Sequence, residues 1–136
     1  MTISYTMNFD GCSKSNPGPS GAGAVIYKDD TEIWSKAVYV GDKYTNNVAE
    51  YSGLIIGLEE ANNMEISNLI VKGDSMLVIK QMKGEYKVKS LSLYPLYERA
   101  KTLAKKIKTI EYIHVYRKDN VRADKLSNDG LELICD

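Results

Sequence analysis

Residues 3–27 read ISYTMNFDGCSKSNPGPSGAGAVIY and contain two predicted β-strands separated by a turn-rich segment. Apolar and polar residues alternate over residues 3–10, which is the period of a half-buried strand. Glycine, proline and serine dominate residues 11–21, and a second apolar run covers residues 22–27. A third run, residues 32–41, follows after a hairpin-like turn. We therefore expect three strands in an antiparallel meander.

The period of the apolar residues changes after this meander. From Asn47 onward they recur every three or four positions, which predicts an amphipathic helix that Asn47 and Glu50 would begin as a capping box. The rest of the chain predicts a strand, two helices, a strand and a last helix capped by Asn120, at residues 68–72, 75–83, 93–108, 110–115 and 120–131. A helix between two strands implies a parallel pair with a right-handed crossover. The expected fold class is α/β, a mixed five-stranded sheet of three antiparallel and then two parallel strands, flanked by helices.

The composition is that of an ordinary globular protein. The chain has 136 residues, 43% of them apolar, and its 18 basic residues balance 18 acidic ones. Residues 1–136 are expected to form a single domain, because this length is in the usual range of one. Two cysteines, Cys12 and Cys135, are too few for a disulfide framework, and no stretch resembles a signal peptide or a membrane span. We expect a cytoplasmic protein that holds any polyanion through local basic clusters or metal ions.

Four acidic residues stand where predicted elements end or begin. Asp10 ends the first strand and Asp74 follows the fourth. Glu50 and Asp124 lie near the starts of two helices. In an open α/β sheet, ligands bind outside the carboxyl ends of the parallel strands. Taken singly, each acid also has a structural explanation, as a cap, a helix-dipole partner or a turn residue, but together they predict a site at one edge of the sheet.

Carboxylates a few ångströms apart repel one another unless cations compensate their charge. Mg²⁺ is a suitable cation because it prefers oxygen ligands and keeps waters that leave room for a phosphate. Two ions about 3.5–4 Å apart can activate a water molecule and stabilise the leaving oxygen of an in-line displacement. The four acids therefore indicate metal-dependent hydrolysis of a phosphodiester, with no covalent enzyme intermediate.

The four acids lie in motifs that together resemble type 1 ribonuclease H. In chain order these motifs are FDGCSKSNPGPSGAG at residues 9–23, TNNVAEY at 45–51, GDS at 73–75 with Gln81, and NVRADKLSN at 120–128. The resemblance implies a ribonuclease H-like fold and an endonuclease that hydrolyses the RNA strand of RNA–DNA hybrids to 5′-phosphate and 3′-hydroxyl ends. It also implies two Mg²⁺ or Mn²⁺ ions held by the catalytic residues Asp10, Glu50, Asp74 and Asp124.

The resemblance also suggests which residues contact the hybrid. Only RNA has the 2′-hydroxyl, which is both a donor and an acceptor. The positions that the family would use for hydroxyls, bases and backbone are Gly11, Cys12, Ser13, Asn16, Asn47 and Gln81. The structural alternatives are a turn role for Asn16 and a solvent-facing position for Gln81.

Two features of the family are missing. The family often carries a mobile loop with a histidine before the last helix, whereas residues 116–119 are YRKD here. Arg117 or Lys118 is a candidate substitute, as a contact to phosphate. His114, the only histidine, lies in a predicted strand and is expected to be structural. The basic protrusion that binds hybrids in some members is also absent from residues 84–91, so we expect weak hybrid binding that depends on the divalent ions.

Two other functions stay open at this point. The chain could be a weakly active or inactive ribonuclease H-like module that binds nucleic acid, although four intact acids favour an enzyme. It could also be a related nuclease that cuts double-stranded RNA, which no feature of the sequence separates from the leading function. No apolar pattern demands a partner chain, so we expect a monomer.

Overall fold

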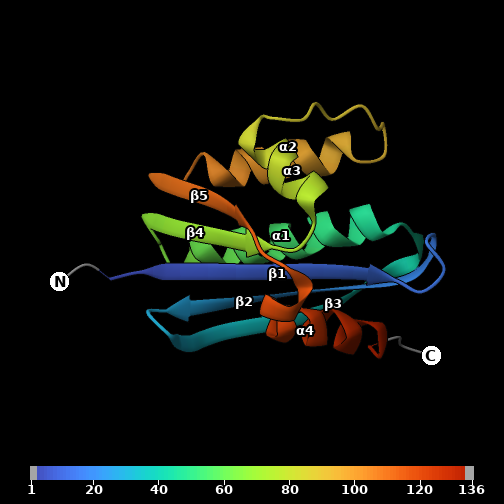
Figure 1. Ribbon diagram of the computed structural model, residues 1–136, viewed down its shortest axis with the longest axis horizontal. Helices are drawn as coiled ribbons and strands as arrows, with labels where there is room; N and C mark the ends of the chain where they lie inside the picture. Colours follow the sequence, from blue (N-terminus) through green and yellow to red (C-terminus); the bar gives the residue numbers. More distant parts are fainter. Residues whose placement is uncertain (1–2, 134–136) are drawn as a thin grey trace.

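The computed structural model describes residues 3–133 as one sheet with helices on both faces (Figure 1). Cys135 lies outside the described residues. The elements in chain order, η1 being a 3₁₀ helix, are β1 (Tyr5–Ser13), β2 (Gly18–Lys28), β3 (Thr31–Tyr44), α1 (Asn46–Asn63), β4 (Asn68–Gly73), α2 (Met76–Lys83), α3 (Tyr94–Ala104), β5 (Thr109–His114), η1 (Arg117–Asp119) and α4 (Val121–Leu131). The predicted order of strands and helices is confirmed, with η1 as an addition.

β1 lies at the centre of the sheet, whose strand order is β3-β2-β1-β4-β5. It pairs antiparallel with β2 and parallel with β4. β3 extends the antiparallel half and β5 the parallel half. The predicted mixed five-stranded sheet is therefore confirmed. No helix within residues 3–133 is long and apolar enough to cross a membrane, and a single domain over residues 1–136 stays a prediction.

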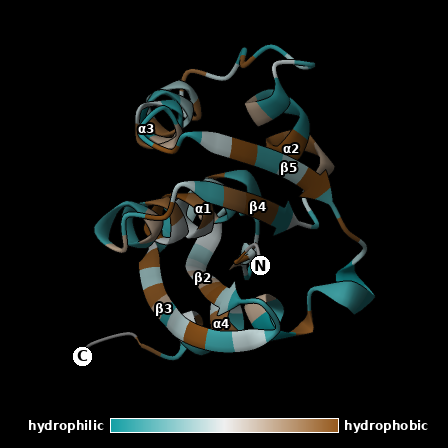
Figure 2. Cartoon of the chain, turned by 90° about the vertical axis from the view of Figure 1, so that its left-hand side faces the viewer, coloured by the Kyte–Doolittle hydropathy of each residue, from teal (hydrophilic) through white to brown (hydrophobic). Residues whose placement is uncertain are grey.

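The two faces of β1 meet different helices (Figures 1 and 2). α1, with α2 and α3 alongside, covers one face, where Met7 and Phe9 are fully buried in the main apolar core. α4 packs on the other face, against β1, β2 and β3. Asn8 and Cys12 alternate with the buried apolar residues of β1, and their side chains reach residues at the start of α4 and within it. The strand period therefore separates an apolar face from a polar one at the centre of the sheet.

The first hairpin extends further than the sequence predicts. β1 continues to Ser13, which pairs with Ser20, so Asp10 lies within the strand rather than at its end. β2 begins at Gly18, because much of the glycine-rich segment is strand. This segment packs closely against α4: a Cβ on Gly21 would lie 2.3 Å from the backbone oxygen of Ser127. Because glycine has no side chain, α4 can pack directly against this part of the sheet.

Two helix boundaries also differ from the prediction. Thr45 is the N-cap of α1, and its side chain accepts a hydrogen bond from the backbone N–H of Val48 at 3.2 Å. The predicted capping box of Asn47 and Glu50 is therefore wrong, because the Glu50 carboxylate is bonded to β1 instead. α3 ends at Ala104 rather than at residue 108, and the turns that follow bury Ile107 in the core.

Candidate metal centre

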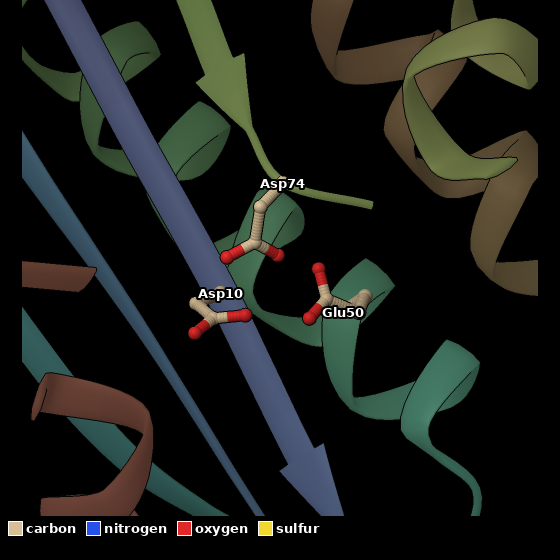
Figure 3. A group of neighbouring side chains, drawn as sticks. All are labelled: Asp10, Glu50 and Asp74. Atoms are coloured by element: carbon tan, nitrogen blue, oxygen red, sulfur yellow. The ribbon is translucent and has the colours of Figure 1, made fainter. Parts of the chain in front are cut away.

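Three carboxylates from different elements converge beside the carboxyl end of β4 (Figure 3). Asp10 lies in β1, Glu50 lies in α1, and Asp74 directly follows β4. One oxygen atom of each lies within 4.8 Å of the others. Asp10 and Glu50 are buried, whereas Asp74 is partly exposed. A set of carboxylate oxygens at this spacing suits a hard divalent cation.

The register of two parallel strands brings Asp10 and Asp74 together. Phe9 of β1 is the partner of Gly73 of β4, so the next residue of each strand emerges at the same edge. β4 stops there, while β1 continues because it still pairs with β2. Asp10 therefore lies where β1 is paired with β2 alone. The edge that β4 leaves free is open to the acids of neighbouring elements.

Glu50 reaches this edge because α1 crosses β1 at Gly11. A Cβ on Gly11 would lie 2.1 Å from the backbone carbon of Ala49, so only glycine allows this approach. The backbone N–H of Gly11 donates to Asp10 Oδ1 at 2.9 Å and to Glu50 Oε1 at 3.0 Å. One backbone group thus orients two carboxylates.

The electrostatics of this cluster also fit a cation. Burial raises the pKa of Asp10 from 3.8 to about 6, and the nearby charge of Asp74 adds to the rise. Burial and the adjacent Asp10 raise the pKa of Glu50 well above its ordinary value. Glu50 Oε2 is buried and has no hydrogen-bond partner among the described residues. Such an atom costs roughly 1–3 kcal/mol, which a bound divalent ion would offset.

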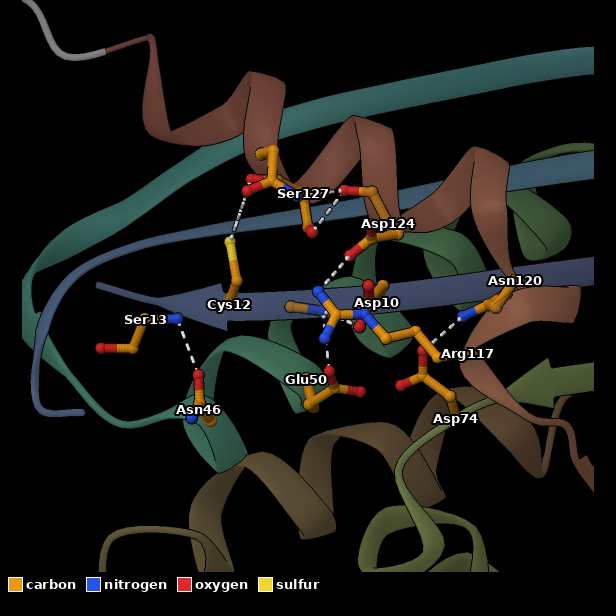
Figure 4. Close-up of polar contacts among 12 residues, drawn as sticks. Asp10, Cys12, Ser13, Asn46, Glu50, Asp74, Arg117, Asn120, Asp124 and Ser127 are labelled. Carbon is orange, nitrogen blue, oxygen red and sulfur yellow. Dashed lines mark hydrogen bonds and ion pairs between the residues drawn. The ribbon is translucent and has the colours of Figure 1, made fainter. Parts of the chain in front are cut away.

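Asp124 approaches the cluster from the first turn of α4. It lines the same pocket of about 200 Å³ as the three clustered acids, although it is not one of the oxygens within 4.8 Å of one another. Its Oδ1 lies 3.7 Å from the guanidinium of Arg117 in η1 (Figure 4). The Arg117 side chain is 81% exposed, so water screens this ion pair strongly. Asp124 therefore lines the pocket while it is paired with Arg117.

The tip of the first hairpin is tied to the start of α1. The backbone N–H of Ser13 donates to Asn46 Oδ1 at 2.8 Å, and the backbone N–H of Asn46 donates to Asn16 Oδ1 at 2.9 Å. Asn46 also lines the pocket, a position that sequence reasoning missed in favour of Asn47. The two adjacent asparagines of the TNN motif make Asn46 as good a candidate as Asn47. Asn47 itself is partly buried and is not among the pocket-lining residues described.

The other residues predicted to contact the hybrid differ in whether they line this pocket. Gly11 and Cys12 line the pocket, and the Cys12 thiol donates to the backbone oxygen of Ser127 at 3.5 Å. Gln81 is only 3% exposed, and its Oε1 accepts a hydrogen bond from the Tyr51 hydroxyl. The alternative that Gln81 faces solvent is therefore wrong, because α2 turns this side chain toward α1.

The segment between β5 and α4 carries the remaining candidates. Arg117 lines the pocket, whereas Lys118 in the same short helix is exposed and does not. His114 ends β5, and its ring contacts Tyr116 edge-on at a centroid distance of 5.6 Å. His114 is likewise not among the residues that line this pocket.

Asn120 has a different role from the predicted one. It precedes α4 as expected, but its side chain makes no capping hydrogen bond. The buried amide is instead bonded to β1 and to Asp74. Sequence patterns cannot reveal this, because its partners lie 46 and 111 residues away.

A mixed sheet with an acidic cluster beside its central strand is the arrangement of ribonuclease H-like proteins, and comparisons with known proteins identify the family. The family described as Reverse transcriptase-like matches residues 8–130. The solved N-terminal RNase H domain of Rv2228c from Mycobacterium tuberculosis, a fusion with maltose binding protein, is 41% identical, with a TM-score of 0.92 over 96% of this chain and 95% of that one. RNase H1 of the halophilic archaeon Halobacterium salinarum NRC-1 is 34% identical, with a TM-score of 0.89 over 94% and 97%. The chain belongs to the type 1 ribonuclease H family.

A further solved relative contains nucleic acid. LC11-RNase H1, in complex with an RNA/DNA hybrid, is 30% identical, with a TM-score of 0.87 over 94% of this chain and 96% of that one. Among curated proteins, the Bifunctional protein Rv2228c of Mycobacterium tuberculosis is 42% identical over 124 residues. That match covers 90% of this chain but 34% of the relative, so the chain spans about a third of that protein's length.

Proposed function

We propose that the chain is a metal-dependent endonuclease that hydrolyses the RNA strand of RNA–DNA hybrids to 5′-phosphate and 3′-hydroxyl products. The observation that carries the proposal is the convergence of Asp10, Glu50 and Asp74, with one buried Glu50 oxygen left without a partner among the described residues. Membership of the ribonuclease H family supports the same activity, and one relative was solved with an RNA/DNA hybrid.

The proposed ligands of two Mg²⁺ or Mn²⁺ ions are the clustered acids together with Asp124. The chemistry that such ions supply is activation of the attacking water and stabilisation of the leaving oxygen. The Gly11 N–H would hold two of the carboxylates in place as the ions arrive, since it is already bonded to both. The unpartnered Glu50 Oε2 would be an open ligand position.

Arg117 is the proposed contact to phosphate. Its guanidinium lines the pocket, and its exposed ion pair with Asp124 could be exchanged for a phosphate oxygen at little cost. Arginine suits this task because its planar group presents several N–H donors to a phosphate. Lys118 stays a second candidate, although it does not line the pocket.

RNA would be selected through its 2′-hydroxyl, which DNA lacks. The proposed contacts are the first-motif residues Gly11, Cys12 and Ser13, together with Asn16, Asn47 and Gln81. The hydrogen-bonded tip formed by Ser13, Asn16 and Asn46 would present these groups beside the carboxylates. Gln81 is only 3% exposed, and its oxygen is bonded in the core.

We expect hybrid binding to be weak and to involve a monomer in the cytoplasm, as the sequence predicts. Basic residues such as Lys83, Lys87 and Lys89 lie at the end of α2 and just beyond it, and each real phosphate contact should add about −0.7 to −0.9 to the slope of log affinity against log salt concentration. A shallow slope in hybrid binding, measured across a series of salt concentrations, would support few contacts.

The decisive experiment compares cleavage of an end-labelled RNA–DNA hybrid, duplex RNA and duplex DNA, with Mg²⁺ and with Mn²⁺. We expect cutting of the hybrid alone, abolished by Asp10→Asn and by Asp74→Asn in variants whose circular dichroism is unchanged. The matched control is Asp129→Asn, because Asp129 is an acid of α4 that pairs with Lys125 away from the cluster.

Other outcomes distinguish the remaining functions. Equal cutting of hybrid and duplex RNA would replace the proposal with a nuclease of broader preference. Hybrid binding without any cutting would leave a nucleic-acid-binding module. Activity that survives both active-site substitutions would remove the carboxylates from the mechanism.

A further inference from the structure

Asn120 is a buried polar residue beside the carboxylate cluster that the proposed mechanism does not use. It is 1% exposed and lies between the end of β4, the middle of β1 and the start of α4 (Figure 4). A buried side-chain amide needs partners for its two N–H donors and its oxygen. The identity of these partners shows what the residue can do.

The partners of Asn120 account for both ends of its amide. Its Oδ1 accepts a hydrogen bond from Asn8 Nδ2 at 2.9 Å. Its Nδ2 donates to the backbone oxygen of Phe9 at 3.0 Å and to Asp74 Oδ2 at 3.4 Å. Because Asn8 is bonded to the oxygen, the two N–H groups are directed at the residue that precedes Asp10 and at the Asp74 carboxylate.

The backbone of Asn120 makes hydrogen bonds to the segments that carry Arg117 and Asp124. Its N–H donates to the oxygen of Arg117 at 3.0 Å, which closes η1. Its oxygen accepts from the N–H of Asp124 at 3.0 Å, which starts α4. One residue therefore joins β1 and Asp74 to the two short segments that carry Arg117 and Asp124.

We propose that Asn120 is a positioning residue of the metal centre. It orients the Asp74 carboxylate and sets where α4 begins relative to β1, and so it sets the spacing between Asp74 and Asp124. It acts through these carboxylates and touches no reacting atom. The inference rests on the proposed function, because it requires that the carboxylates hold divalent ions. Hydrogen-bond partners of ligating carboxylates commonly change metal affinity about tenfold or more when removed.

The test measures Mg²⁺ binding rather than activity. Isothermal calorimetry of the full chain with Mg²⁺ alone should give an affinity about tenfold weaker for Asn120→Ala than for the unsubstituted protein. The matched control is Asn62→Ala, because the Asn62 amide also donates to a backbone oxygen, that of Leu103 at 3.1 Å, far from the cluster. The control should keep its Mg²⁺ affinity within about twofold even where it lowers stability. An Asn120→Ala protein that folds and binds Mg²⁺ as tightly as the unsubstituted one overturns the inference.

A second measurement covers the case in which Asn120→Ala does not fold. In the unsubstituted protein labelled with ¹⁵N, the side-chain amide signals of Asn120 should shift as Mg²⁺ is added, while those of Asn62 stay in place. Signals of Asn120 that do not move during saturation overturn the inference without touching the proposed function. A protein that shows no saturable Mg²⁺ binding at all instead removes the metal centre on which the proposed function depends.

Discussion

The two sides of the pocket are built in different ways. On one side, Asp10, Glu50 and Asp74 project from regular elements whose spacing is set by strand register and by the close contact of α1 with Gly11. On the other side, Arg117 and Asp124 lie on a three-residue helix and on the first turn of α4, and they meet in an exposed ion pair. Backbone packing holds the first side, whereas on the second side the exposed ion pair between Arg117 and Asp124 can rearrange at little cost.

The largest effect is expected where α1 meets β1. Gly11→Ala places a Cβ against the backbone of Ala49, so the helix must move and Glu50 must leave the Gly11 N–H. We expect a loss of about 3 kcal/mol or more in the free energy of unfolding, and a fall of about 100-fold in hybrid cleavage. Urea titration and single-turnover cleavage measure the two.

The matched control for this substitution is Gly84→Ala. A Cβ at Gly84 would meet no atom within 4 Å, but the residue has a φ of +83°, so backbone strain alone should cost about 1 kcal/mol and leave cleavage intact. If Gly11→Ala behaves like Gly84→Ala, close packing does not hold the first side of the pocket.

The pH dependence of stability should distinguish the two sides without nucleic acid. Asp10 has a pKa of about 6 in the folded protein against 3.8 ordinarily, so between these values the folded state keeps a proton that the unfolded chain releases. The metal-free protein should therefore lose stability as the pH rises from about 4 to about 6, and Glu50, whose pKa burial also raises, should continue the loss at higher pH. Asp10→Asn removes the part of this loss that comes from Asp10 and should stabilise the metal-free protein at pH 8 by about 3 kcal/mol.

The comparison for this prediction is Asp124→Asn, which removes a partly exposed carboxylate and its ion pair with the exposed Arg117, and it should change stability by less than about 1 kcal/mol. Thermal unfolding from about pH 4 to about pH 8, with EDTA and with Mg²⁺, measures these differences. Mg²⁺ should narrow the gap between the unsubstituted protein and Asp10→Asn at the alkaline end. A metal-free protein whose stability rises between about pH 4 and about pH 6 would contradict the buried-acid account of Asp10.

Arg117→Ala is expected to affect substrate rather than fold. Loss of a charged hydrogen bond to phosphate should lower kcat/KM about tenfold, mainly through KM, and change stability by less than about 0.5 kcal/mol. Lys118→Ala is the control, since Lys118 neighbours Arg117 but does not line the pocket, and its kcat/KM should stay within about twofold. Full turnover with an unchanged KM in Arg117→Ala would remove this residue from phosphate binding.

The smallest effect is expected at the outer edge of α4. Arg122 is bonded to both oxygens of Glu32 in β3, at 2.9 and 3.1 Å, but the side chains are 38% and 36% exposed. Arg122→Ala should lower the free energy of unfolding by about 0.5 kcal/mol or less and leave cleavage unchanged. A larger loss in urea titration would mean that this ion pair, rather than close packing on β2, holds α4 on the sheet.

Much of the fold and the acids of the pocket were predictable from local patterns. The alternation of residues 3–10 and the helical period after Asn47 depend only on neighbours in the chain, and they predicted the order of elements that the structure confirms. Local patterns also predict that Asp10 and Asp74 lie at one edge, because Asp10 ends one predicted strand and Asp74 follows another. Their side-by-side position follows from the pairing of Phe9 with Gly73. The sequence indicates a sheet with parallel strands, but it does not give this register.

The details that orient the site came only from tertiary structure. The sequence predicts capping roles for Glu50 and Asn120. In the structure, Glu50 accepts a hydrogen bond from the Gly11 N–H, and Asn120 donates one to Asp74. The physical reason is range: capping and periodicity are decided within about four residues, whereas these hydrogen bonds join residues 39 and 46 positions apart. The sequence by itself determined which elements form and which acids are available, and close packing of helices on the sheet decided where those acids point.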